Sequence, residues 1–475
     1  MKFRYKICAV MLLLAMLAGC AKREQPADVE PTPTPTVAPT PEPTPEPTPA
    51  PQANPLTGEE GAYANKRPVA VTLRTLTGSE PLWGIERAGL LIEGVTEGTT
   101  PTLMAVFADA AEISKVGPVG PGRDLTLQFA LPLNAVPVHI DKNIYASNLL
   151  NALQYQDLDG YHIGKAAFAF DDGRQAAGYL EENCWYTTAA LVQSGLQQYA
   201  ATTEGPNTPL FRFGQRPAVA EADRNAAELV IGFSQDSAVR MRYNAETGLY
   251  QRFDGSGNAV LDADNGAQPA FANVVVLYAA SGIKDDGYTR QYDMSGGTGL
   301  YLNAGRWEEI RWSKEDATAP LVLTDLGGAP LTVATGKCYL AVWGGYYGQT
   351  IELYDAAGNA QPLPAKPALL ESGVPDDVAA AAYEEFVLRQ RIVDARAALS
   401  DAEAELPGAQ QALEEALQAR QQNPGEAADA LVAERQAAVD EWNRIIEENR
   451  PIVEQADAAA AAAAAAAGET PPAEG

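Results

Sequence analysis

Four ionisable residues in the middle of the chain could together perform acid–base chemistry. Glu93 and Glu97 lie at or just beyond the end of an apolar run, Arg123 follows a glycine-rich loop, and His139 ends another run. A carboxylate beside an imidazole can exchange protons with a substrate, and an arginine can hold a carboxylate or phosphate group. The alternative is structural: Glu97 pairs with Arg123, and His139 is a satisfied, partly buried imidazole. We favour this alternative and keep Glu93, Glu97 and His139 as catalytic candidates and Arg123 as the ligand-binding candidate.

Other kinds of site are poorly supported by residue type. The histidines are His139 and His162, and the cysteines beyond the N-terminal region are Cys184 and Cys338. This set does not match a usual zinc site, so we expect no metal and no cofactor. No serine or cysteine lies in a nucleophile motif with an evident base. The loop 117–122 lacks the Gly-Lys-Ser/Thr ending of a phosphate-binding loop, so a structural loop is expected.

The elements that must position these residues alternate between strands and helices. Short apolar runs bounded by Gly, Pro or Thr predict buried strands, and longer amphipathic stretches predict helices. The predicted strands are 69–73, 90–95, 103–107 and 136–140, and the predicted helices are 124–131, 144–153 and 188–200. The alternation predicts a mixed α/β-type domain over residues 55–216.

The next region, residues 217–360, has a different pattern. Strand-like runs recur at short intervals between turn signals such as Glu246-Thr247-Gly248: 229–233, 239–243, 249–253, 274–278, 299–302, 309–312 and 339–342. This spacing is typical of a mainly antiparallel β domain. The fold class is therefore α+β, with a mixed domain followed by a β-rich domain.

An acidic, alanine-rich segment follows the linker 361–375. Pro375-Asp376-Asp377 suits a helix start, and Pro407-Gly408 is expected to end that helix after Leu406. Asn423 is expected to cap a second helix, so that 376–457 could form a helical hairpin, either a partner-binding element or a solvated spacer. Residues 458–475 read as a low-complexity tail. Coiled-coil packing is conceivable, although Ala and Gln interrupt the heptads.

The N-terminus predicts delivery to a membrane surface. Lys2, Arg4 and Lys6 precede an apolar run of signal-peptide length, about half of the ~20 residues that span a bilayer. Leu17-Ala18-Gly19-Cys20 then resembles the lipobox of bacterial lipoproteins, which implies removal of residues 1–19 and acylation of Cys20, with palmitate-type chains in the lipid bilayer. Residues 20–54 are rich in Thr-Pro and Glu-Pro and predict an extended stalk.

Charge and cysteine content limit the partners. The net charge is −28, which argues against binding nucleic acid. Residues 376–475 hold 7 basic and 21 acidic residues, so they carry about half of this charge. Cys184 and Cys338 could form a disulfide outside the cell, but two isolated buried thiols fit their positions better.

Residues 54–355 resemble the DUF3048 (YerB-like) family of bacterial lipoproteins, in two consecutive family domains. The matching residues run from Asn54-Pro55-Leu56-Thr57-Gly58 through Leu91-Ile92-Glu93-Gly94, Val116-Gly117-Pro118-Val119, Val138-His139 and Leu158-Asp159-Gly160 to Tyr243-Asn244-Ala245-Glu246-Thr247-Gly248. The resemblance implies fold and location but no activity. This chain departs from the family pattern at polar positions, among them Thr102, Gly120, Asp141 and Cys184, while the apolar framework persists.

Two classes of function follow. The first is a non-catalytic envelope protein, anchored to the extracytoplasmic face of the cell membrane, that binds a wall component or a protein partner. The second is an envelope hydrolase that cleaves wall glycan or peptide with Glu93 or Glu97 and His139. This chain differs from the family at polar positions that could line a shared pocket. That difference favours the non-catalytic envelope protein, because a preserved reaction would require preserved polar groups.

Overall fold

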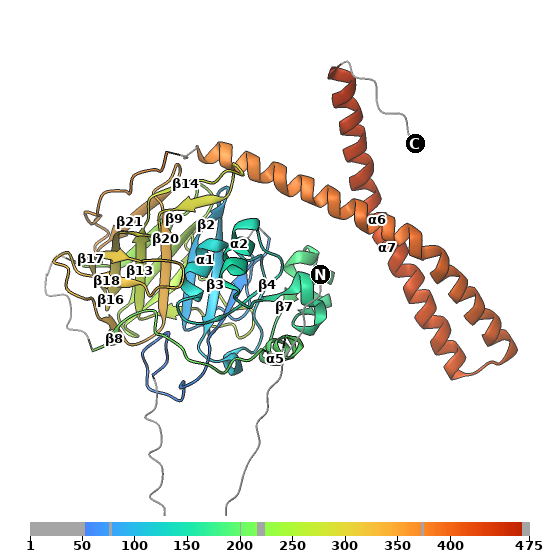
Figure 1. The fold of residues 1–475 in the computed structure, drawn as a ribbon, viewed down its shortest axis with the longest axis horizontal. Helices are drawn as coiled ribbons and strands as arrows, with labels where there is room; N and C mark the ends of the chain where they lie inside the picture. The colour runs from blue at the N-terminus through green and yellow to red at the C-terminus, as the bar shows by residue number, and fades with distance from the viewer. Residues whose placement is uncertain (1–52, 76–77, 200, 216–223, 372–374, 468–475) are drawn as a thin grey trace, which may run out of the picture. The chain divides into compact units, whose positions relative to one another are not determined.

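Two β-sheets form the centre of the molecule (Figure 1). The computed structural model describes residues 53–75, 78–199, 201–215, 224–371 and 375–467; the predicted signal peptide, Cys20 and most of the stalk lie outside these ranges. The larger sheet has ten strands, in the order β18 (Val322–Thr324), β17 (Arg306–Ser313), β16 (Gly296–Asn303), β13 (Asn273–Tyr278), β20 (Cys338–Trp343), β2 (Leu90–Glu97), β3 (Thr100–Phe107), β1 (Val69–Leu73), β4 (Val136–His139) and β5 (Leu158–Asp159).

Most central strands of this sheet run in the same direction. β13, β20 and β2 are neighbours in parallel register, as are β1, β4 and β5, and β3 lies antiparallel between β2 and β1. β16, β17 and β18 extend the sheet by antiparallel pairing. The carboxyl ends of β13, β20, β2, β1, β4 and β5, and of β17, therefore lie at one edge of the sheet.

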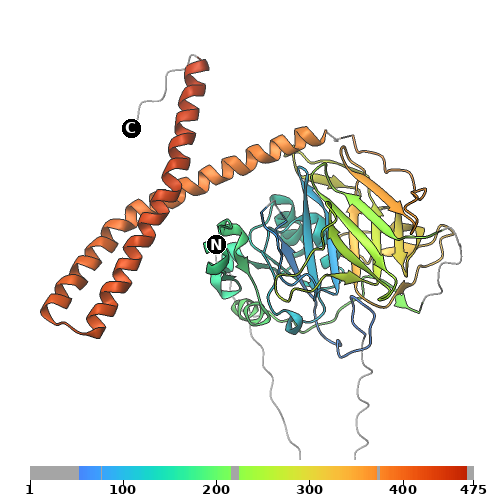
Figure 2. The same cartoon turned by 180° about the vertical axis from the view of Figure 1, so that it is seen from behind.

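A five-stranded antiparallel sheet packs on one face of the larger sheet. Its order is β12 (Ala270–Phe271), β11 (Leu249–Asp254), β10 (Ala238–Asn244), β9 (Glu228–Gly232) and β21 (Thr350–Tyr354). Alternate residues of β1, such as Val69 and Val71, share one apolar cluster with Ile231 and Met241 of the smaller sheet. The view from behind in Figure 2 shows the two sheets stacked face to face.

Short helices surround the sheets: α1 (Asp124–Ala130), α2 (Ile144–Leu153), α3 (Gly160–Ile163), α4 (Asp172–Ala176) and α5 (Ala189–Gln198), with 3₁₀ turns at Ala110–Glu112, Gly164–Ala166 and Glu181–Asn183. α1 packs Leu125 and Phe129 on the face opposite the smaller sheet, and α5 packs Val192 and Leu196 into the inter-sheet cluster. Three small pairs complete the strands: β14 (Ser281–Ile283) with β15 (Arg290–Tyr292), β8 (Phe213–Gly214) with β19 (Val333–Ala334), and β6 (Ala169–Phe170) with β7 (Trp185–Tyr186).

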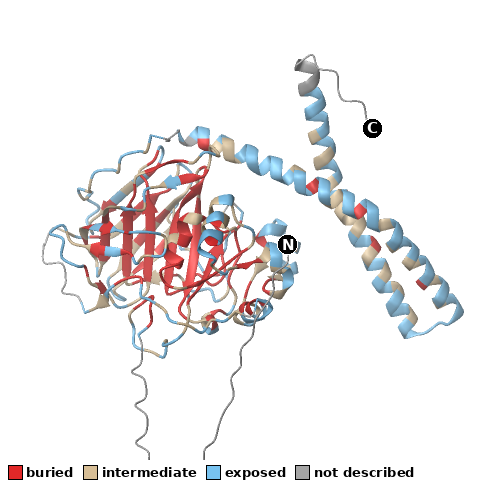
Figure 3. Ribbon diagram, viewed as in Figure 1, coloured by how far each residue is buried: buried red, intermediate tan, exposed pale blue. Residues whose placement is uncertain are grey.

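Two long helices, α6 (Asp376–Gln422) and α7 (Glu426–Ala467), form an antiparallel hairpin. Ion pairs between Arg450 and Glu403 and between Arg396 and Asp457 join them. Figure 3 contrasts their mostly exposed residues with the buried strands. None of the described helices is long and apolar enough to span a membrane.

Three sequence predictions for this hairpin were wrong. α6 continues through Pro407, because packing against α7 and the helix-favouring Ala, Leu and Gln residues around it outweigh the cost of an interior proline, about 3 kcal/mol. Asn423 ends α6 and does not begin α7, whose first turn is closed by the Gly425 carbonyl. The alanine run up to Ala467 is helical, as the high helix propensity of alanine allows.

The predicted α+β fold class is confirmed. β1 and α2 have the predicted bounds, and the other strands and helices predicted before the hairpin differ at their ends by a few residues. One feature was not predicted: strands from both predicted domains share the ten-stranded sheet, through the parallel β2–β20 pair. The proposed boundary between residues 216 and 217 remains a prediction.

Candidate functional site

Three of the four predicted site residues, Glu97, Arg123 and His139, lie near one edge of the ten-stranded sheet. Glu97 ends β2, His139 ends β4, and Asp159 ends β5, and these three strands run in the same direction. Arg123 immediately precedes α1. Ligands of open α/β sheets bind at the carboxyl ends of parallel strands, so this edge is the natural place to look for a site.

Glu97 and Arg123 form a closed, two-pronged ion pair. Arg123 Nε lies 2.7 Å from Glu97 Oε1, and Nη2 donates to Oε2 at 2.7 Å. Nη1 donates to the Gly122 carbonyl at 2.9 Å, and Asn143 donates to Glu97 at 3.3 Å. Burial alone would lower the pKa of Arg123, but the charge of Glu97 raises it. The pair therefore matches the structural interpretation of the sequence.

Glu93 points away from this pair, into the space between the two sheets. Arg252 of β11 donates to its two carboxylate oxygens at 2.6 and 3.1 Å, and the Tyr339 hydroxyl donates at 2.6 Å. Burial and the charge of Glu93 raise the pKa of the Tyr339 hydroxyl. Because β11 and β20 lie far from Glu93 along the chain, no local sequence pattern indicates these partners.

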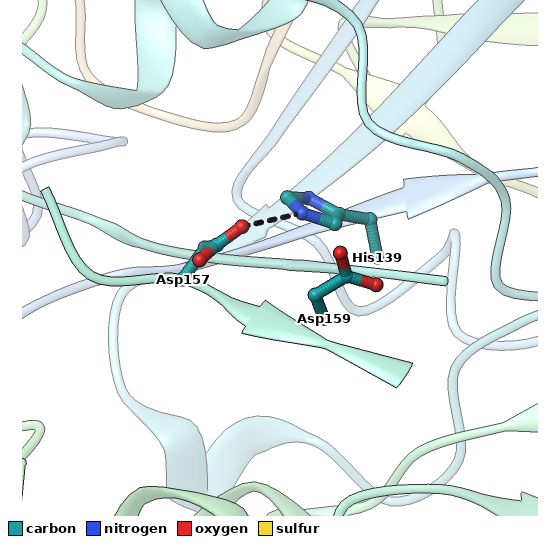
Figure 4. A group of neighbouring side chains, drawn as sticks. All are labelled: His139, Asp157 and Asp159. Carbon is teal, nitrogen blue, oxygen red and sulfur yellow. Dashed lines mark hydrogen bonds and ion pairs between the residues drawn. The ribbon is translucent and has the colours of Figure 1, made fainter. Parts of the chain in front are cut away.

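His139 belongs to a third cluster, drawn in Figure 4. Its side chain is fully buried, and Nε2 lies 2.8 Å from Asp157 Oδ2. Gly122 permits this packing, since a Cβ there would lie 2.7 Å from His139 Nδ1. Lys142 Nζ contacts Asp157 at 2.9 Å and Asp159 at 2.7 Å.

The cluster has the donor set of a divalent cation site, but an ammonium group lies among its carboxylates. One atom each of His139, Asp157 and Asp159 lie within 4.8 Å of one another, and an imidazole with two carboxylates suits several divalent metals. Lys142 already supplies a positive charge to both carboxylates. Burial opposes the shift, but hydrogen bonds and charge from His139 and Lys142 lower the pKa of Asp157 to about 2. The prediction that the chain has no metal site remains a prediction.

The structure therefore divides the predicted constellation among three ion-paired clusters. Glu93 pairs with Arg252, Glu97 with Arg123, and His139 with Asp157. Asp157 and Lys142 were not among the predicted site residues. The available signal was the Asp157-Leu158-Asp159 spacing, which in an extended segment places both carboxylates on one face.

The remaining predicted residues have separate positions. Cys184 and Cys338 are buried free thiols, and burial raises the pKa of Cys338 to about 12. The predicted lipidation site, Cys20, lies outside the described residues.

Comparison with known proteins relates the central region of the chain to one protein family. Residues 56–202 match the family described as "Protein of unknown function (DUF3048) N-terminal domain", and residues 229–340 match its C-terminal domain. The chain is 24% identical over 268 residues to "Putative lipoprotein YerB" of Bacillus subtilis (strain 168), which covers 55% of this chain and 77% of that protein.

The crystal structure of YerB from Bacillus subtilis has a similar fold. It superposes with a TM-score of 0.55 at 20% identity, covering 63% of this chain and 99% of YerB. The two family matches end before α6 begins, so the helical hairpin lies beyond the matched regions. On these matches, the chain belongs to the DUF3048 family.

Proposed function

We propose that this protein is a membrane-anchored, extracytoplasmic binding protein of the cell envelope, without catalytic activity. One observation supports the absence of catalytic activity. The carboxylates of the two catalytic candidates, Glu93 and Glu97, are buried and ion-paired with arginine. Glu93 is 2% exposed and Glu97 is 3% exposed, each in contact with two guanidinium nitrogens. A general acid or base must reach the proton that it transfers, and these groups have no such access.

The proposal that the protein is membrane-anchored rests on its N-terminal sequence and on its similarity to YerB. Leu17-Ala18-Gly19-Cys20 has the order of a lipoprotein cleavage site, and YerB carries the name of a lipoprotein. Two or more acyl chains on Cys20 would hold the protein at the membrane, since each buried CH₂ contributes about 0.8 kcal/mol. The bound partner would be a wall component or another envelope protein.

Anchoring is tested by producing the full-length protein in a bacterium fed an alkyne fatty acid. The wild type and a Cys8→Ala control should carry the label and sediment with membranes, whereas Cys20→Ala should carry no label. Equal labelling of Cys20→Ala would refute the proposed anchor.

Catalysis is tested by incubating the full-length protein with purified cell-wall sacculi. Protein in the pellet, with no fragments released to the supernatant by mass spectrometry, is the expected result for a binding protein. Fragments that disappear with Glu97→Gln but persist with the exposed-residue control Glu60→Gln would establish the hydrolase alternative instead. Glu97→Gln must first be shown to fold, by its circular dichroism spectrum.

A further inference from the structure

A cavity of about 500 Å³ lies at the amino end of β17, at the edge of the ten-stranded sheet opposite the carboxyl ends of its parallel strands. Three segments form its walls: residues 224–225 ahead of β9, Trp307 and Glu309 of β17, and Asp355 with residues 361–364 after β21. Sites for small molecules typically have volumes of about 300–1,000 Å³. The cavity is therefore large enough for a small organic ligand.

Backbone hydrogen bonds join these walls. The Trp307 N–H donates to the Arg224 carbonyl at 3.1 Å, which ties the segment before β9 to β17. The Ala227 N–H donates to the Tyr354 carbonyl at 2.8 Å, which ties the same segment to the end of β21. Leu363 of the third wall packs against the apolar cluster between the sheets. The cavity is thus built into the fold, so a ligand would not have to order its walls.

Glu309 presents a carboxylate to this cavity that the rest of the described chain does not use. It lies two residues after Trp307 on β17, so both side chains are on the same face of the strand. Glu309 is half-buried, and within the described ranges no hydrogen bond or ion pair engages its carboxylate. Asp355 differs, because Asn359 donates its backbone N–H and its side-chain amide to the Asp355 carboxylate at 2.8 and 3.0 Å. Glu309 is therefore the acceptor that is available to a ligand.

The lining carries charges of both signs. Arg224 is positive, with its guanidinium 4.6 Å from the centroid of the Trp307 ring, and Glu309 and Asp355 are negative. A ligand with a single charge of either sign would meet a like charge here. A hydroxyl group both donates and accepts hydrogen bonds, so a neutral ligand with several hydroxyls can use carboxylate, guanidinium and the Gln361 amide together.

The third wall adds apolar surface to these polar groups. Pro362, Leu363 and Pro364 follow one another along the cavity. A sugar ring combines hydroxyl groups at its rim with C–H groups on its faces, and such faces pack on apolar surface. We propose that this cavity binds a neutral sugar unit of a wall glycan, with Glu309 accepting hydrogen bonds from its hydroxyl groups. The inference rests on the proposed binding function and names the class of wall component.

The first test measures binding and the role of Glu309. Detergent-purified full-length protein is titrated calorimetrically with tri-N-acetylchitotriose, a neutral trisaccharide, and separately with trilysine, a cationic peptide. The trisaccharide should bind saturably to the wild type and at least about 5-fold more weakly to Glu309→Gln, because a hydrogen bond to a charged acceptor is lost. Glu315→Gln, at an exposed position, is the control and should bind like the wild type. No saturable trisaccharide binding, equal binding to Glu309→Gln, or binding of trilysine instead would overturn the proposal.

The second test fills the cavity. Gln361→Trp places a bulky side chain in the lining, whereas Ala365→Trp places the same side chain at an exposed position just beyond it. The trisaccharide should raise the melting temperature of the wild type and of Ala365→Trp, since it binds the folded state, but not that of Gln361→Trp. Melting without ligand verifies that each variant folds. A Gln361→Trp variant that is stabilised like the wild type would locate the sugar elsewhere and overturn the proposal.

Sedimentation with sacculi separates this inference from the proposed function. A protein that sediments with sacculi but does not bind the trisaccharide would refute the sugar cavity and leave the proposed binding function standing. A protein that does neither would refute both.

Discussion

The carboxylate of Glu93 illustrates how a candidate catalytic group becomes a structural one. It lies between two sheets, with Arg252 and Tyr339 filling the hydrogen-bonding capacity that a substrate would need. Glu97 is filled in the same way by Arg123 and Asn143. Residue type alone therefore identified groups with catalytic potential, and the structure shows the partners that each of these two groups contacts.

Glu93→Gln should destabilise the protein strongly, because it leaves the Arg252 guanidinium buried without a counter-charge. We expect a loss of about 3–5 kcal/mol in the free energy of unfolding, measured by urea denaturation. Glu60→Gln, at an exposed position, should change it by less than about 0.5 kcal/mol. A Glu93→Gln variant as stable as the wild type would show that this pair does not stabilise the core.

Asp157 should make stability depend on acid pH. Its pKa in the folded protein is about 2, against an ordinary value of 3.8, so the folded state favours the ionised form. The contribution of about 2 kcal/mol is fully present above about pH 4 and is lost as the pH falls towards 2.

Asp157→Asn should remove that part of the pH dependence. Thermal melts at closely spaced pH values between 2 and 5, fitted to free energies, measure the effect. Asp236→Asn, whose side chain is exposed, should keep the wild-type slope. An unchanged slope in Asp157→Asn would mean that other carboxylates govern acid unfolding.

At the scale of elements, a few apolar and aromatic side-chain contacts hold the start of α6 against the region of the β14–β15 hairpin. Ala379 is fully buried against Ile283 and Tyr346, and Tyr288 stacks on Phe386 with ring centroids 5.0 Å apart. These contacts link the first turns of the extension to residues of the matched family region.

Ala379→Glu should release these first turns, because it places a charge in an apolar contact. Hydrogen exchange of the backbone amides in 376–390 should become faster, while amides of the ten-stranded sheet keep their protection. Ala381→Glu, two residues further on at an exposed position, is the matched control and should leave exchange unchanged. Equal protection in both variants would mean that Ala379 does not hold α6.

Local patterns predicted the elements well and their partners poorly. β1 and α2 have the predicted bounds because apolar periodicity and caps such as Asn143 act within a few residues. The Glu97–Arg123 pair was among the interpretations of the sequence, because a strand end and a helix start were expected to meet at one edge of the sheet, although the two residues lie 26 apart in the chain. The Glu93–Arg252 pair spans 159 residues and depends on which strands become neighbours, which no local pattern encodes. Helix α6 continues through Pro407 for the same reason: packing by α7 outweighs a local breaker.

At the scale of the whole molecule, the two family regions share one sheet. β2 from the first region pairs with β20 from the second over five residue pairs, and the core cluster between the sheets contains residues from both. A protein built in this way loses the core of one region when the other unfolds.

Residues 55–216 and 217–360 should therefore unfold in a single transition. The buried thiols provide a probe in each region: Cys184 in the first and Cys338 in the second. Pulsed alkylation across a urea gradient, in Cys338→Ser and Cys184→Ser variants, should give the same midpoint for both remaining thiols. Two clearly separate midpoints would show that the regions are independent domains.

The Lys142 ammonium supplies a positive charge to its cluster from within the chain. It lies where an imidazole and two carboxylates could otherwise gather a free cation, and it is covalently part of the chain. A tethered ion cannot be lost by dilution, captured by a competing chelator or exchanged for the wrong metal. The positive charge that Lys142 brings to Asp157 and Asp159 is therefore present at a fixed stoichiometry as soon as the chain folds.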